Sequence, residues 1–216
     1  MKTNLLLLFE NHPYFTIEGF RQATGMENPE QVRALLYRWA KADHILQLKK
    51  GVYMTRRFYE QHSADYNFLS MVSAILVPQS YLSLDFILQK HNILTEITYP
   101  VTCITLKNTK KINNSLGVFW YRHMREDLYQ GFTIEEVHGV RFAQASLAKA
   151  LFDFLYLRPI PAKYRALKVD LAKELRLKID ELSPDDREEF SSYIDASDSP
   201  KMKEIDKNFR RNAWQL

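Results

Sequence analysis

The sequence predicts an α+β protein, with an N-terminal domain over residues 1–60 and a larger domain over residues 61–216. Three observations lead to this prediction. Helical apolar spacing near the N-terminus gives way to a short hairpin pattern, β-branched and aromatic runs fill residues 98–143, and helical spacing returns from residue 144. Hydrophobic residues make up 46% of the 216 residues, which is typical of a folded chain.

The first predicted helix begins after Thr16, whose hydroxyl is suited to cap the free backbone amides of the first turn. Phe15, just before this cap, is expected to pack on Phe20 as a hydrophobic staple. Gly25 ends the helix, because glycine adopts a positive φ at little cost. A second helix is predicted from Asn28-Pro29, with asparagine as the cap and proline in the first turn.

The second helix divides into a buried and an exposed face. Val32, Leu35, Leu36 and Trp39 recur at helical spacing and predict the buried stripe. At about 100° per residue, the opposite face carries arginine, tyrosine and lysine side chains, which suit phosphates and base edges. Residues 45–48 and 52–55 then predict two strands joined by Lys49-Lys50-Gly51.

This order of helix, turn, helix and basic hairpin predicts a winged helix-turn-helix that binds double-stranded DNA. A helix face carrying arginine and lysine is also common as a merely solvated surface, so it is the ordered set of elements that favours DNA. The candidate DNA-contacting residues are Gln31, Arg33, Tyr37, Arg38, Lys41, Lys49 and Lys50.

The second domain is predicted as helices around a small, mostly antiparallel sheet, reached through a polar connection at residues 56–66. Helices are expected at 66–76 and 80–91, and His138-Gly139 is expected to turn between the last two strands. The predicted strands are 101–106, 116–123, 132–137 and 140–143, and the later helices are 144–157, 162–175, 184–194 and 201–214.

The charge is distributed unevenly, with the basic excess in the N-terminal half, and the cysteine content fits a reducing compartment. Residues 1–60 hold nine Lys/Arg against six Asp/Glu, whereas residues 126–216 hold 15 against 17. This asymmetry weakly favours a polyanionic partner for the N-terminal half. The single cysteine, Cys103, cannot form an internal disulfide. The apolar run at residues 5–9 is too short for a signal peptide core or a membrane span, so we expect a cytoplasmic protein.

No catalytic constellation is evident, so the sequence predicts a protein that is not an enzyme and needs no cofactor. Six glycines form no phosphate-binding loop, and the six histidines are scattered without metal-like spacing. The Gly-Ser with spaced aspartates that marks nucleotidyltransferases is also missing.

Three segments give the chain a resemblance to a known family. They are Lys50-Gly51-Val52-Tyr53, Ser80-Tyr81-Leu82-Ser83-Leu84, and residues 145–156 with Lys149, Ala150, Leu151 and Asp153. In these segments the sequence resembles the AbiEi family, the antitoxins of type IV toxin–antitoxin systems linked to abortive phage infection. The chain departs from the family pattern at Leu147-Ala148, where a proline-glutamate pair is usual.

The resemblance implies a DNA-binding front domain that represses its own operon and a rear domain that neutralises a nucleotidyltransferase-like toxin. The expected target is the protein's own promoter, as an inverted repeat if two copies bind. Two alternatives stay open at this point. The chain could be a protein-interaction module whose winged helix does not bind DNA, or an orphan transcriptional regulator without a toxin.

Overall fold

The computed structural model describes residues 4–95, 100–165 and 168–214 of a mixed α+β chain. The chain divides into two compact units. The first comprises Met1–Pro78 together with Lys111–Phe119 and Glu135–Phe142, and the second comprises Gln79–Lys110, Trp120–Ile134 and Ala143–Leu216. The first unit therefore continues past the predicted boundary at residue 60 and takes in two later segments of the chain.

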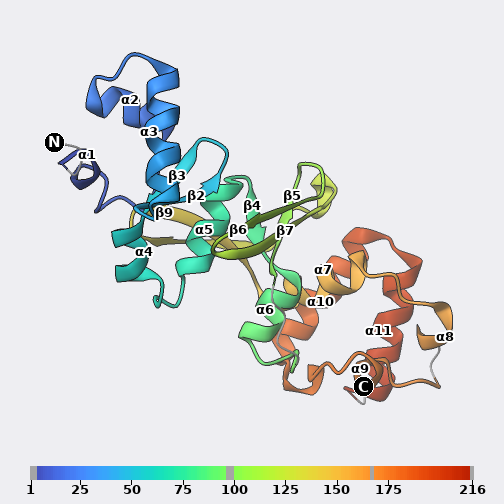
Figure 1. Cartoon of the computed structure of the whole chain (residues 1–216). Coiled ribbons are helices and arrows are strands. Elements are labelled where there is room, and N and C mark those ends of the chain that lie inside the picture. The colour runs from blue at the N-terminus through green and yellow to red at the C-terminus, as the bar shows by residue number, and fades with distance from the viewer. Residues whose placement is uncertain (1–3, 96–99, 166–167, 215–216) are drawn as a thin grey trace. The chain divides into compact units, whose positions relative to one another are not determined.

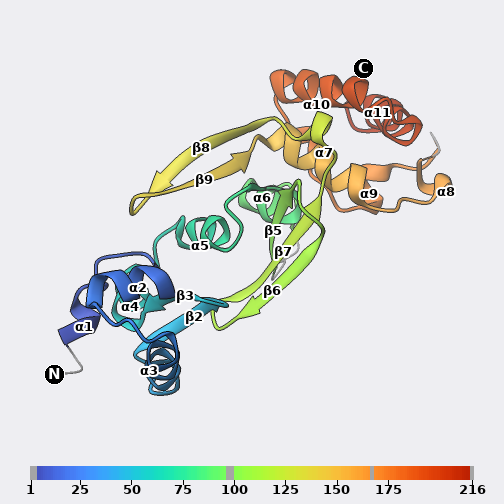
Figure 2. The same ribbon diagram turned by 90° about the horizontal axis from the view of Figure 1, so that it is seen from above.

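The main part of the first unit combines short helices with a three-stranded antiparallel sheet of order β1-β3-β2. Its helix α3 stands beside the β2–β3 hairpin in Figure 1 and is seen nearly along its axis in Figure 2. The elements are α1 (Asn4–Leu7), β1 (Phe15–Thr16), α2 (Ile17–Thr24), α3 (Pro29–Lys41), β2 (Ile45–Lys49), β3 (Val52–Thr55), α4 (Arg56–His62) and α5 (Phe68–Leu76).

The predicted start and end of α2 are confirmed. The Thr16 hydroxyl accepts a hydrogen bond from the backbone amide of Gly19 at 3.0 Å, and Gly25 ends the helix with a φ of 68°. The rings of Phe15 and Phe20 lie 6.0 Å apart, and Phe20 also meets Trp39 edge-on at 5.7 Å. These aromatic contacts form the centre of the core on which α2 and α3 pack.

The prediction of a polar connection at residues 56–66 is wrong for its first part, because Arg56–His62 forms the helix α4. The Thr55 hydroxyl caps this helix by accepting from the backbone amide of Phe58 at 3.1 Å. The Phe58 side chain is buried and anchors the helix, although it is the only strongly apolar residue near its centre. One buried aromatic ring leaves no periodic pattern in the sequence, which is why the helix was missed.

A six-stranded sheet has the order β6-β7-β5-β4-β9-β8, and its outer strands form two long hairpins (Figure 2). The central strand β4 pairs antiparallel with β5 and parallel with β9, so the sheet is mixed. The strands are β4 (Ser80–Leu82), β5 (Val101–Thr105), β6 (Lys110–Asn114), β7 (Gly117–His123), β8 (Phe132–Val137) and β9 (Val140–Ala145).

Two of these strands correct the sequence prediction. Ser80–Leu82 was expected to open a helix but forms β4, and the helix α6 starts only at Leu84. A short apolar run fits either structure, and the strands on both sides of β4 decide in favour of the strand. The sequence predicts no strand between residues 106 and 116, but Lys110–Asn114 forms the edge strand β6, where polar side chains are tolerated.

The remaining helices belong to the second unit. The predicted helix at 162–175 is instead two short helices, and the stretch between them includes residues outside the described part of the chain. The start of α10 is confirmed, since Ser183 and Asp186 form a capping box. The helices are α6 (Leu84–Lys90), α7 (Leu147–Leu157), α8 (Ala162–Arg165), α9 (Leu171–Glu174), α10 (Pro184–Ser197) and α11 (Pro200–Asn212).

Among the described residues, every helix is too short or too polar to cross a membrane.

Candidate nucleic-acid interface

Helix α3 is held by a cap at its start and by a buried stripe along its length. The Asn28 side chain accepts hydrogen bonds from the backbone amides of Glu30 at 2.9 Å and Gln31 at 3.3 Å. The predicted stripe is confirmed, because its four residues are at most 7% exposed: Val32, Leu35, Leu36 and Trp39. With one face buried in this way, the opposite face of the helix is left for solvent or a ligand.

The predicted contact residues of α3 lie on that outer face. Arg33, Arg38 and Lys41 are exposed, and Tyr37 is 63% exposed. The Lys41 ammonium lies 5.7 Å from the centre of the Tyr37 ring, and Arg38 Nε donates to the carbonyl of Ala34 at 3.3 Å. These contacts are local and leave most of the donors of the two side chains available to a ligand. Gln31 is exposed in the first turn of the same helix.

The two lysines of the β2–β3 hairpin have different surroundings. Lys50 is exposed at the turn, next to Gly51 with its φ of 78°. Lys49 is half-buried, and its ammonium donates to the carbonyls of Ile75 and Leu76 at 2.9 and 2.8 Å. These carbonyls end α5, where a positive charge is favourable. The structure thus gives Lys49 a partner within the protein, and we do not retain it in the proposed interface.

Two acidic residues lie on or close to the exposed face of α3, namely Glu30 in its first turn and Asp43 just after its end. Asp43 follows the helix and lines a shallow groove of about 430 Å³ together with Tyr37 and Lys41. Its carboxylate pairs with Arg56, and the hydrogen bond between them raises the pKa of the guanidinium. Because Arg56 offsets its charge, Asp43 does not leave an isolated negative charge beside the basic residues.

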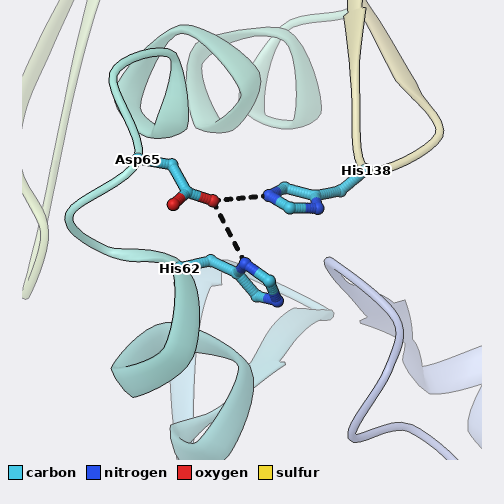
Figure 3. A group of neighbouring side chains, drawn as sticks. All are labelled: His62, Asp65 and His138. Atoms are coloured by element: carbon cyan, nitrogen blue, oxygen red, sulfur yellow. Dashed lines mark hydrogen bonds and ion pairs between the residues drawn. The ribbon is translucent and has the colours of Figure 1, made fainter.

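The structure also gathers side chains that the sequence showed as scattered. His62, Asp65 and His138 have their side-chain ligand atoms within 4.8 Å of one another (Figure 3). Hydrogen bonds from His138 and from His62 lower the pKa of Asp65. The only sequence signal was the three-residue spacing of His62 and Asp65, since His138 joins them through the fold.

A second cluster lies in the second unit and unites two of the three segments behind the family resemblance. Asp153 accepts from the Tyr81 hydroxyl at 3.0 Å and from the Ser83 hydroxyl at 2.7 Å, and it pairs with the Lys149 ammonium. All four side chains are buried. Burial raises the pKa of Asp153 and lowers the pKa of Lys149, while the attraction between them opposes both shifts.

This second cluster has the features of a structural group. The Lys149 ammonium lies 5.0–5.6 Å from the ring centres of Tyr81, Phe152 and Tyr193, which enclose it. Burial is the main cause that raises the pKa of the Tyr81 hydroxyl, which therefore stays protonated and donates to Asp153. Through its bond to Tyr81, the pair joins α7 to β4. Neither charged side chain has exposed surface, so the pair is closed to external ligands.

In comparisons with protein-family models and with curated proteins, no match to this sequence was found.

Proposed function

We propose that this protein is a transcriptional regulator that binds double-stranded DNA through α3 and the β2–β3 turn. In this proposal the first unit is a winged helix-turn-helix, with α2 and α3 as its helix pair and the β2–β3 hairpin as its wing. The order of these elements supports it, as does the antiparallel β1-β3-β2 sheet that carries the hairpin.

The observation that carries the proposal is the outer face of α3. Arg33, Tyr37, Arg38 and Lys41 share the side of the helix opposite its buried stripe. Arginine reads guanine edges with two hydrogen bonds, and lysine and tyrosine bind phosphate oxygens. A single exposed helix with these side chains suits the width of the major groove. Lys50 on the hairpin turn would then add a contact to phosphate or the minor groove.

We further propose that the DNA target is the promoter of the protein's own gene, read in the cytoplasm as an inverted repeat by two copies. In the same proposal the second unit neutralises a nucleotidyltransferase-like toxin. The support for both statements is the resemblance to AbiEi antitoxins. In the structure, residues from two of its segments, Tyr81, Ser83, Lys149 and Asp153, form one buried cluster.

A salt-titrated mobility-shift assay on DNA from upstream of the gene tests the DNA proposal. The wild type should bind this DNA more tightly than random DNA, with affinity falling steeply as salt rises. The variant Arg33→Ala/Arg38→Ala should lose specific binding and reduce the log–log salt slope by about two, roughly one for each cationic side chain removed from the DNA interface.

The matched control is Lys173→Ala/Lys178→Ala, which removes the same charge from exposed positions of the second unit. This control should bind the upstream DNA as the wild type does. Equal weakening in both double variants would mean that net charge, and not α3, causes the binding. A wild type that does not distinguish upstream from random DNA would exclude the operator claim.

The toxin proposal has a separate test, in which the protein is co-expressed with a nucleotidyltransferase encoded beside its gene. Growth arrest by that enzyme should be relieved by the wild type and equally by Arg33→Ala/Arg38→Ala, because the DNA-binding face is not needed for neutralisation. Arrest that persists with both proteins would contradict the antitoxin role and leave the DNA proposal untouched.

A further inference from the structure

Two histidines and an aspartate meet on the first unit. His62 is the last residue of α4, Asp65 follows three residues later, and His138 occupies the turn between β8 and β9. The same carboxylate oxygen, Asp65 Oδ2, lies 3.1 Å from His62 Nδ1 and 2.7 Å from His138 Nε2 (Figure 3). Both imidazole rings therefore point a nitrogen at one carboxylate group.

We infer that His62, Asp65 and His138 bind a divalent transition metal ion, with Zn²⁺ as the representative ion. Two imidazoles and one carboxylate are a donor set preferred by zinc and its neighbours in the first transition series, whereas calcium and magnesium prefer oxygen ligands alone. The inference does not depend on DNA binding, because none of the three residues belongs to the proposed interface.

The distances in the cluster are close to those that an ion requires. Ligand atoms about 2.0–2.2 Å from a tetrahedral ion lie roughly 3.3 Å from one another. The two nitrogen–oxygen distances are 2.7 and 3.1 Å, so these two pairs have to separate by only a few tenths of an ångström. The third pair, the two imidazole nitrogens, lies within 4.8 Å and closes to about the same spacing when both rings turn toward the ion. Three protein ligands also leave the fourth position open to water or another small ligand.

The protons between the imidazoles and Asp65 can make way for a metal ion. In the ion-free cluster the nitrogens facing Asp65 carry hydrogens and donate them to the carboxylate. Each neutral imidazole has a second tautomer, with its hydrogen on the other nitrogen, that frees the inner lone pair for the ion. Binding therefore requires a shift of tautomer in each ring.

The surrounding structure holds the ligands in place before an ion arrives. The Phe58 ring packs against both histidine rings, with centres 4.4 Å from His62 and 5.4 Å from His138. His138 and Gly139 both have positive φ, which sets the tight turn that presents the second imidazole. Nearby, Asn67 Nδ2 donates to Glu135 at 3.3 Å and ties the same hairpin to the start of α5.

A Zn²⁺ titration of the full, tag-free chain tests the inference, with uptake measured by competition against a chromophoric chelator. The wild type should bind one ion per chain. The variants Asp65→Asn and His138→Gln should each weaken binding by at least about 100-fold, since loss of an outer-sphere partner alone costs about 10–100-fold. The control His12→Gln, an exposed histidine of the same unit, should bind as the wild type does.

A thermal melt of each protein, in chelator and in excess Zn²⁺, separates binding from folding. All four proteins should be folded in chelator, and Zn²⁺ should raise the melting temperature only of the wild type and His12→Gln. Absence of stoichiometric uptake by the wild type would overturn the inference and leave the cluster as a hydrogen-bonded bridge. Uptake that Asp65→Asn and His138→Gln both retain would overturn it as well, by placing the ion elsewhere.

Discussion

The lysines at positions 49 and 50 show how neighbouring residues of one type take different roles. The ammonium of Lys49 neutralises the carbonyl end of α5, while Lys50 faces solvent at the turn. Lys49→Met keeps the aliphatic stem but removes two charge-assisted hydrogen bonds, so it should lower the free energy of unfolding by about 1.5–3 kcal/mol. Urea denaturation measures this loss.

Lys50→Ala is the matched control for Lys49→Met, since it changes the neighbouring lysine. It should alter the free energy of unfolding by less than about 0.5 kcal/mol and should reduce the salt slope of DNA binding by about one. If Lys49→Met left stability unchanged and reduced the salt slope instead, Lys49 would be the contact to DNA and its hydrogen bonds to α5 would not matter.

The buried pair of Lys149 and Asp153 gives a prediction on stability alone. Lys149→Met leaves an uncompensated carboxylate among aromatic rings and should destabilise the protein by about 3–5 kcal/mol. Adding Asp153→Asn removes that charge and keeps an oxygen acceptor for Tyr81 and Ser83, so the double variant should be more stable than Lys149→Met. Urea denaturation of the wild type, Lys149→Met, Asp153→Asn and the double variant gives the coupling energy between the two residues, and strictly additive effects would contradict the coupling.

At the scale of elements, the cap of α3 connects stability to the proposed DNA face. Asn28→Ala removes the acceptor for two backbone amides and should destabilise the protein by about 1 kcal/mol, within a range of roughly 0.5–2. Asn28→Gly should cost only a few tenths of a kcal/mol. Urea denaturation compares the two, and an equal loss in both would mean that the Asn28 side chain is not the source of the stabilisation.

Elements with a cap and a periodic apolar face could be predicted from the sequence. Thr16 and Asn28 each mark a helix start that the structure confirms, because a capping bond forms between residues two or three positions apart. Strand β4 could not be predicted in this way. Its assignment depends on pairing with β5 and β9, whose paired residues come 21 to 62 positions later in the chain.

The same distinction applies to the candidate sites. The exposed face of α3 follows from helical spacing within one segment, so its arginines and Tyr37 could be placed from the sequence. The partners of Lys49 lie 26 and 27 residues away, and those of Asp65 include His138, 73 residues away. Contacts between residues so far apart in the sequence depend on tertiary packing, and local residue patterns do not reveal them.

At the scale of the whole molecule, the division into two units makes a prediction about local opening. Leu36 is fully buried in the core of the first unit. Leu36→Ala should destabilise that core by about 2–5 kcal/mol. Hydrogen exchange should then accelerate in Met1–Pro78 and also in the segments Lys111–Phe119 and Glu135–Phe142, which belong to the same unit.

The amides of α7 and α10 serve as the internal control, because both helices lie wholly in the second unit. Their exchange should stay close to that of the wild type. Acceleration of equal size throughout the chain would show that the two units open together. Acceleration confined to Met1–Pro78 would show that the two later segments do not open with the rest of the first unit.

The chain passes between the two units five times, and this has a consequence for its synthesis. The first unit receives its last segment at Phe142, so it stays incomplete on the ribosome until that residue has emerged. At roughly 5–20 residues per second, translation reaches this point about 7–28 s after it starts. During that time the Phe58 ring of the front segment lacks the His138 ring that packs against it in the finished unit, and a nascent unit with such incomplete packing is prone to bind chaperones. A gene truncated at codon 60 or 78 would leave the product in this unfinished state permanently.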